Sequence, residues 1–404
     1  MPDIERPAGI IARVIDLSGK RRWVVLLASV AFAGGGAWSA LHTPLDALPD
    51  LSDTQVIIAT EWMGRNPTLI EDQVTYPIVT SFLGAPNVKT VRGFTMFGMS
   101  FVYVIFQDGT DLYWARSRVV EYLSKVRARL PVGVNPQIGP DATSVGWVYQ
   151  YALVDPSGKH SLQELRSLQD WTVRYALQAV EGVSEVAGVG GFEKQYQVQV
   201  DPDRLKAFGV SVGEVAAAIR SANDEVGGRV IEMAEHEYSV RGRGYIRSVQ
   251  DIELAVVATR ADGIPIRVRD LGTVAIGGNI RRGVAELDGM GEVVAGIVVM
   301  RSGENALDVI KRVKARIDEI RPTLPEGVKL VTVYDRSTLI LDSVQTLTEN
   351  VAQIVLIVLL VIAVFLFHLR SALVNVAALA VAVLGSFIAF YLLKMTINIM
   401  SLES

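Results

Sequence analysis

Three long apolar runs stand out along the chain, and the residues between the first two alternate between hydrophobic and polar positions instead. The runs extend over Trp23 to Leu41, Val351 to Leu369 and Ser371 to Leu393. At 1.5 Å of rise per residue, each run is long enough as a helix to cross a hydrocarbon layer of about 30 Å. The pattern therefore predicts three transmembrane helices, at 23–41, within 337–369 after a linker helix, and at 371–393.

The amphipathic stretch between the first two runs holds two copies of one pattern. In each copy a Gly-Met is followed by an apolar strand, a helix containing Val-x-Ala-Arg, and an exit through Leu-Pro-x-Gly-Val. The first copy starts at Gly98 and the second at Gly289. Each copy also has a front half that reads as strand, helix and strand. The pattern therefore predicts two ferredoxin-like βαβ-βαβ subdomains.

About a hundred residues separate the two halves of the second copy, and we interpret them as an inserted subdomain. The expected subdomains are 42–140 for the first copy, 141–191 with 290–336 for the second, and 192–289 for the insert. Within the insert, Asn223 to Tyr245 is rich in glycine and charge, which predicts a protruding hairpin able to reach a neighbouring subunit. The alternative is an exposed loop without a partner.

The composition fits a protein with both membrane and aqueous parts. Half of the 404 residues (50%) are hydrophobic and 20% are charged, and the mean hydropathy is +0.32. These values are too apolar for an ordinary soluble globule and too charged for an all-membrane chain. The net charge of −4 is small and spread along the chain, which argues against nucleic acid as a partner. The absence of cysteine excludes disulfides and thiolate metal sites.

Basic residues gather beside the first apolar run and predict how the chain crosses the membrane. They are Arg13, Lys20, Arg21 and Arg22. By the positive-inside bias they place the amino terminus in the cytoplasm, with 1–22 as a surface helix there and the short turn around His368 on the same side. Residues from about 42 to 345 are then outside. The length of the run 23–41 exceeds the apolar region of an ordinary signal peptide, which favours a retained anchor.

Short motifs along the whole chain belong together. In chain order they are Thr43-Pro44-Leu45-Asp46-Ala47-Leu48-Pro49-Asp50, Glu71-Asp72-Gln73-Val74-Thr75-Tyr76-Pro77, Tyr113-Trp114-Ala115-Arg116, Gly139-Pro140-Asp141-Ala142-Thr143, Leu168-Gln169-Asp170-Trp171, Tyr334-Asp335-Arg336-Ser337 and Asn398-Ile399-Met400-Ser401-Leu402. Together they resemble the heavy-metal efflux permeases of the resistance-nodulation-division superfamily. The second and third motifs are most similar to the copper/silver branch rather than the cobalt/zinc/cadmium branch.

This resemblance implies a function and a setting. The family consists of proton-driven, homotrimeric exporters in the inner membrane of Gram-negative bacteria, each a multi-pass protein of twelve transmembrane helices. They work with a periplasmic adaptor (membrane fusion) protein and an outer-membrane channel. The resemblance therefore implies Cu(I) or Ag(I) as the transported ion, with no resident cofactor.

The carboxyl-terminal end of the sequence departs from the family pattern. In the family, the Asn-Ile-Met-Ser-Leu motif leads into a glycine-rich fourth helix that bears the acidic proton-relay residues. Here Leu402 is followed only by Glu403 and Ser404. We therefore expect 394–404 to be the start of that fourth-helix region and the chain to be the amino-terminal part of a permease, not competent for transport alone.

Two other functional classes compete with a transporter. An assembly or adaptor-docking module, which trimerises or binds the periplasmic partner without moving metal, is the alternative. An enzyme is not supported, because the sequence shows no nucleophile–base pair, phosphate loop or ligand cluster.

Methionine supplies the candidate metal ligands, because thioether sulfur can hold soft Cu(I) or Ag(I) where cysteine is absent. Met400 is the first candidate, since the resemblance places the methionine of its motif in a methionine relay near the membrane. Met96 and Met99 flank a Phe-Gly pair near a strand start, and Met395 has only its proximity to Met400 in its favour. The alternative for each is core filling. The four histidines show no ligand spacing.

The apolar runs contain no ionisable side chain in their interior, although a proton relay needs one inside the bilayer. Gln353 and Asn375 are their larger polar residues, and we interpret both as hydrogen-bonding between helices. We interpret Gly34, Gly35 and Gly36 as sites of close helix packing.

Overall fold

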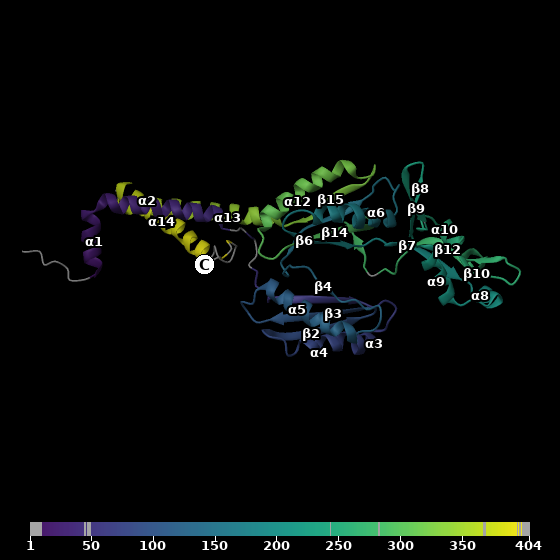
Figure 1. The fold of residues 1–404 in the computed structure, drawn as a ribbon. Coiled ribbons are helices and arrows are strands. Elements are labelled where there is room, and N and C mark those ends of the chain that lie inside the picture. The colour runs from purple at the N-terminus through teal and green to yellow at the C-terminus, as the bar shows by residue number, and fades with distance from the viewer. Residues whose placement is uncertain are drawn as a thin grey trace, which may run out of the picture.

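The computed structural model describes residues 10–43, 46, 50–242, 244–281, 283–366, 369–393, 395 and 397. It consists of a slender helical part and a larger part, formed by residues 50–335, that contains two main sheets (Figure 1). We call this larger part the outer portion because it lies beyond the ends of the long helices. The helical part contains α1 (Ile10–Lys20), α2 (Arg22–His42), α13 (Arg336–Leu366) and α14 (Leu369–Leu392). Motif residue Met400 and the turn residue His368 lie outside the described residues.

Three helices are long and apolar enough to cross a membrane, as the three runs predict. The qualifying segments are Arg22–His42, Arg336–Ile362 and Val374–Leu392. The linker helix expected before the second run is continuous with it, since α13 begins at Arg336, directly after the last outer strand, and extends over 31 residues. One unbroken helix therefore joins the outer portion to the second apolar run.

Helices α2 and α14 lie side by side and run in the same direction (Figure 1). The rings of Trp38 and Tyr391 contact each other edge to face, with their centroids 5.1 Å apart, and Gly35 lies opposite Ile388. A Cβ on Gly36 would clash with the backbone carbonyl of Leu384, so this glycine permits the close approach of the two helices. The packing interpretation is thus confirmed for Gly36, whereas no described residue lies within 4 Å of a Cβ added to Gly34.

The first sheet of the outer portion has four antiparallel strands in the order β2-β3-β1-β4. Alternating residues of β1 and β3, such as Ile58 and Val102, are buried under the helices, while their neighbours point to the opposite face. Asp111 caps the helix Leu112–Val126, the longest one over this sheet, by accepting from the backbone N–H of Trp114. The elements are β1 (Gln55–Glu61), α3 (Pro67–Ile70), a π-helical turn (Glu71–Thr75), α4 (Tyr76–Phe82), β2 (Val88–Met96), β3 (Met99–Phe106), α5 (Leu112–Val126) and β4 (Gln137–Ile138).

The second sheet repeats this plan. Strands β6, β14, β5 and β15 occur in the order that β2, β3, β1 and β4 have in the first sheet, and a short strand, β13, pairs with the start of β14. In both copies a 15-residue helix, α5 or α12, ends in a 3-10 turn. The elements are β5 (Trp147–Val154), α6 (Leu162–Leu168), a π-helical turn (Gln169–Val173), α7 (Arg174–Gln178), β6 (Val183–Val189), β13 (Ala285–Glu286), β14 (Glu292–Met300), α12 (Ala306–Ile320) and β15 (Lys329–Asp335).

A separate unit with its own hydrophobic core lies between β6 and β13. Strand β7 pairs with β12, β10 pairs with β11, and residues such as Leu205, Val215 and Leu271 form the core. The elements are β7 (Lys194–Val200), α8 (Pro202–Phe208), α9 (Val212–Ala222), α10 (Val249–Glu253), β10 (Val256–Thr259), β11 (Pro265–Arg267), α11 (Val268–Leu271) and β12 (Gly272–Gly278).

A hairpin projects from this unit, as the glycine-rich and charged stretch predicts. Strands β8 (Val226–Met233) and β9 (His236–Gly242) pair only with each other, and the side chains of residues 227–240 are all exposed (Figure 1).

Candidate functional site

A buried ion pair lies where the outer portion meets the helices. Arg336, the first residue of α13, is 2% exposed, and its Nη2 lies 2.7 Å from Oδ1 of Asp46 on the segment that follows α2. Its Nη1 also donates to the carbonyl of Val145. The backbone N–H of Asp46 donates to the carbonyl of Ile397, which follows α14. Two motifs far apart in the sequence thus join the ends of all three long helices to the second sheet.

The residues around Arg336 fix the start of α13. The Asp335 carboxylate accepts from the backbone N–H and hydroxyl of Ser337 and pairs with Lys314 of α12. Burial acts to raise the pKa of Asp335, but these hydrogen bonds outweigh it and lower the pKa below its ordinary value. The helix is therefore held to the sheet by a charged cap.

A second carboxylate holds the linker between the two sheets. Asp141 accepts from the hydroxyls of Tyr113 and Ser184, and its Oδ2 lies 2.9 Å from Nε of Arg301. One helical turn along α5, Arg116 donates to the carbonyl of Gly139. The Tyr-Trp-Ala-Arg motif therefore binds the Gly-Pro-Asp-Ala-Thr motif, and both connect the first sheet to the second.

Replacing Asp141 by asparagine is expected to make stability less dependent on pH. Burial acts to raise the pKa of Asp141, but hydrogen bonds from Ser184 and Tyr113 outweigh it and lower the pKa. The carboxylate therefore contributes stability that is present above the unfolded pKa of about 3.9 and lost as pH falls through the lower folded pKa. Asp141→Asn should cost about 1–2 kcal/mol at pH 7, and the deficit should shrink below about pH 4.

Denaturant unfolding followed by tryptophan fluorescence at pH 7, 5 and 3.5 measures this difference. The control is Asp72→Asn, which changes an exposed carboxylate of the first sheet's helical layer. An Asp141→Asn deficit that is the same at every pH would contradict the assignment.

A cavity of about 920 Å³ opens beside the buried ion pair, between the outer ends of the helices and the second sheet. Sulfur, carboxylate and imidazole groups all line it, from Met300, Met395, Asp46, Glu304 and His42. Met395 is the sequence candidate that this cavity contains. Among the described residues, however, no group of three or more His, Asp or Glu side chains is placed to hold a metal ion.

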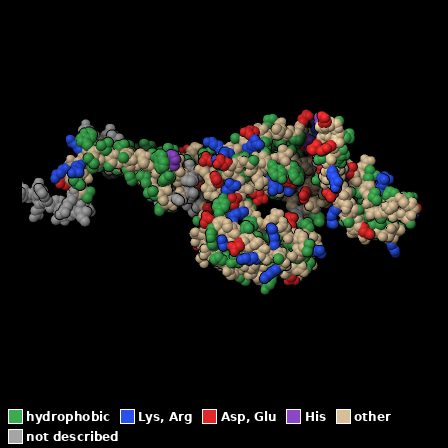
Figure 2. All heavy atoms as spheres, viewed as in Figure 1, with side chains coloured by type: hydrophobic (Ala, Val, Ile, Leu, Met, Phe, Trp, Pro, Cys, Tyr) green, Lys and Arg blue, Asp and Glu red, His purple; other side chains and the backbone are tan. Residues whose placement is uncertain are grey.

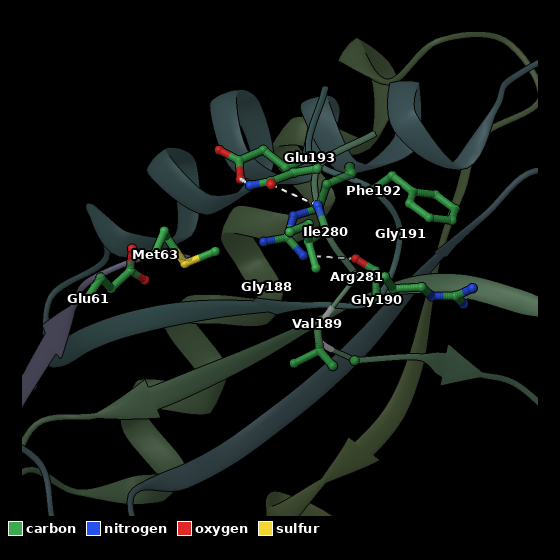
Figure 3. Close-up of a pocket in the computed structure, with 13 residues that line it drawn as sticks. Glu61, Met63, Gly188, Val189, Gly190, Gly191, Phe192, Glu193, Ile280 and Arg281 are labelled. Atoms are coloured by element: carbon green, nitrogen blue, oxygen red, sulfur yellow. Dashed lines mark hydrogen bonds between the residues drawn. The ribbon is translucent and has the colours of Figure 1, made fainter. Parts of the chain in front are cut away.

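A smaller pocket of about 440 Å³ lies between the first sheet, the second sheet and the base of the inserted unit. Glu61 and Met63, at the end of β1, lie next to each other on one side of it, and Phe192 and Arg281 lie on the other side (Figure 3). The guanidinium of Arg281 lies over the Phe192 ring, with its Cζ 5.0 Å from the ring centroid, and pairs with Glu292. The glycines at 188, 190 and 191 form its floor, where a Cβ on Gly191 would lie 2.7 Å from Val294.

The structure separates the methionine candidates into two places. Met96 and Met99 lie at the turn between β2 and β3, away from Met395 at the helix ends. Met63, which sequence reasoning did not single out, lies at the same end of the first sheet as Met96 and Met99. Only the pairing of β1 with β3 could have revealed it, because Met63 follows a strand far from both in sequence.

The apolar lengths of the described helices carry no Asp, Glu, Lys, Arg or His. This holds between Arg22 and His42 in α2, beyond Glu349 in α13, and after Arg370 in α14. Figure 2 shows charged side chains over the outer portion and beside α1, with hydrophobic ones along the helices between them. Gln353 and Asn375 are exposed on their helices, and their hydrogen bonding between helices stays a prediction.

Comparison with known proteins places the chain in a family. Residues 14–404 match the sequence profile of the AcrB/AcrD/AcrF family. The chain is 49% identical, over 393 residues and 97% of its length, to the putative cation efflux system protein SilA of Salmonella typhimurium and to the cation efflux system protein CusA of Escherichia coli (strain K12). It spans only 38% of the length of each of these two relatives.

A solved structure agrees with the sequence comparison. The crystal structure of a heavy metal efflux pump, in crystal form II, superposes with a TM-score of 0.86 at 31% identity and covers 96% of this chain and 39% of that chain. Because the family profile covers nearly all of the chain and the motifs resemble the same group, the chain belongs to the AcrB/AcrD/AcrF family of resistance-nodulation-division permeases.

Proposed function

We propose that this chain is the amino-terminal part of a proton-driven efflux permease for Cu(I) or Ag(I), a transporter rather than an enzyme. The carrying observation is its 49% identity to two cation efflux system proteins, against 38% to the cobalt-zinc-cadmium resistance protein CzcA of Cupriavidus metallidurans. Two of its motifs, at 71–77 and 113–116, are most similar to the copper/silver branch, and the chain contains methionine but no cysteine. Both observations favour the soft monovalent ions.

The proposed architecture is a multi-pass protein of the Gram-negative inner membrane. The three apolar helices cross the bilayer, the amino terminus is cytoplasmic, and the outer portion is periplasmic. The two sheets are ferredoxin-like porter subdomains, and the unit between β6 and β13 is an inserted docking subdomain. Supporting this, both sheets share one strand order and one sequence of elements.

Met400 is the proposed metal ligand near the membrane. Support comes from its motif and from the cavity at the helix ends, where Met395 and Met300 place further sulfur atoms. No resident cofactor is proposed, since the metal is the cargo.

The proposed partners are two further copies of the chain, a periplasmic adaptor protein and an outer-membrane channel. The hairpin β8–β9 is the element proposed to reach a neighbouring subunit, because all its described side chains between 227 and 240 are exposed. A non-transporting assembly or adaptor-docking module is the second candidate, favoured by a separately folded insert with a core of its own.

The 404-residue chain alone is expected not to export metal. Its described helices hold no charged group that could couple proton entry to a conformational cycle. Expressed in a cell that lacks copper and silver pumps, the protein should reach the membrane and leave the silver concentration that stops growth unchanged. Co-expression of a chain supplying the remaining helices of a related permease should restore resistance.

Two other outcomes of that experiment would contradict this expectation or favour the docking module. Lower silver accumulation with the chain alone, abolished by a protonophore, would show that the proton path lies within these residues. Trimerisation or adaptor binding without any rescue of resistance would favour the docking module.

A further inference from the structure

Methionines gather at one end of the first sheet. The structure describes seven methionines, and three of them, Met63, Met96 and Met99, lie at this end. Because methionine is among the less common residues, such a concentration requires a physical account.

The strand register places two of the three side by side. Met96 lies directly opposite Met99 across the tight turn formed by Phe97 and Gly98, and Met99 lies directly opposite Glu61. Residues opposite each other in an antiparallel pair point to the same face, with Cβ atoms about 4.5–5.5 Å apart. Two thioethers and one carboxylate therefore form a row across three strands.

The third methionine is brought to this row by the loop after β1. The backbone N–H of Trp62 donates to the carbonyl of Gly98 at 2.9 Å, and the N–H of Gly98 donates to the carbonyl of Arg65 at 3.1 Å. These two bonds lie on either side of Met63 in the chain and hold its backbone beside the turn between β2 and β3. Figure 3 shows Met63 next to Glu61 at the rim of the smaller pocket.

Core filling does not account for these side chains. Ser100 and Val102, the neighbours of Met99 along β3 on the opposite face, are completely buried under the helices. By contrast, Met63 and Met96 are each 40% exposed. Met99 is partly exposed. A methionine that fills a core would be buried, so these side chains reach the surface of the sheet.

We propose that Met63, Met96 and Met99 form a thioether site for a soft monovalent cation, Cu(I) or Ag(I), on the outer portion. Thioether sulfur selects such ions, and three sulfurs from two adjacent strand ends and a docked loop can converge on one ion. Glu61, on the same face, adds a negative charge near the bound cation. Binding follows from this chemistry alone, whereas a role in moving metal rests on the proposed function.

Silver titration of the purified chain in detergent tests the site, with methionine methyl groups labelled with ¹³C and observed by NMR. The background is Met400→Ile, because Met400 is proposed as a separate ligand. Three methyl signals should shift together and saturate with the first equivalent of Ag(I), and Zn²⁺ should leave them in place. Met63→Leu, Met96→Leu and Met99→Leu assign the signals and preserve apolar volume.

Each single variant should weaken silver binding about tenfold or more, and the triple variant should lose one bound equivalent. Met290→Leu, which changes an 88% exposed methionine outside the cluster, is the control and should change neither value. Circular dichroism melting confirms that the variants are folded. Unchanged affinity in all three single variants, or three signals that shift independently of one another, would overturn the site. Because silver binding is measured here without transport, the thioether site can be confirmed even if the growth experiment contradicts the proposed function. It can likewise be overturned even if the growth experiment supports that function.

Discussion

Replacing Arg336 by methionine should lower the free energy of unfolding of the chain by about 3 kcal/mol or more. The guanidinium is 2% exposed, and it pairs with Asp46, whose side chain is 15% exposed. Methionine has a similar length but no charge, so the Asp46 carboxylate would lose its counter-charge and the carbonyl of Val145 would lose its donor. Removing one partner of a buried ion pair costs more than the pair itself contributes, because the remaining charge stays poorly solvated.

Thermal and denaturant unfolding in detergent measure this loss. Arg260→Met, which breaks an exposed pair with Asp262, is the matched control and should change stability by less than about 1 kcal/mol. Replacing Asp46 by leucine together with Arg336→Met should recover part of the stability, since the buried carboxylate is then gone as well. Equal effects of Arg336→Met and Arg260→Met would show that the pair at the junction is not buried.

Gly36→Ala should separate helices α2 and α14 and cost about 1–3 kcal/mol, although alanine is the better helix former. The added Cβ would meet the backbone of Leu384, which cannot rotate out of the way. Gly34→Ala makes the same chemical change two residues earlier, where no atom of the described residues lies within 4 Å of the added Cβ. That variant should be neutral or more stable, by up to about 1 kcal/mol.

Cross-linking reports this contact directly, because the native chain contains no cysteine. Cysteines in place of Trp38 and Tyr391, whose rings contact each other, should be joined in high yield by a short bifunctional maleimide, which spans the gap that the two missing rings leave. The yield should fall in the Gly36→Ala background and stay high in the Gly34→Ala background. The same yield in both would mean that α14 can slide along α2 without cost.

Local patterns were sufficient to predict the main elements of this chain. An apolar run of twenty or so residues can satisfy its backbone in a bilayer only as a helix, so 23–41 leads directly to α2. The repeated motifs likewise predict two equivalent units, because the same strand, helix and exit signals occur in the same order. The continuity of the linker helix with the second apolar run was less visible, since polar residues such as Asp342 and Glu349 interrupt the apolar pattern without interrupting α13.

The long-range contacts could not be predicted in this way. The pairing of Arg336 with Asp46 depends on how three helix ends meet, and no periodicity encodes that meeting. The contrast between Gly34 and Gly36 depends on which face α2 turns towards α14. Met63 is similar, because its neighbours Met96 and Met99 reach it only through the register of β1 against β3.

Helix α13 continues from the edge of the second sheet into the apolar part without proline or glycine, the residues at which helices usually bend. At 1.5 Å per residue its 31 residues form a rod of roughly 46 Å. Its outer end follows directly on β15, and Arg336 donates to the carbonyl of Val145 just before β5, so a rotation of the sheet is passed on to the helix. A tilt of only about 5° at the sheet would displace the far end by roughly 4 Å, about three-quarters of the 5.4 Å rise of one helical turn.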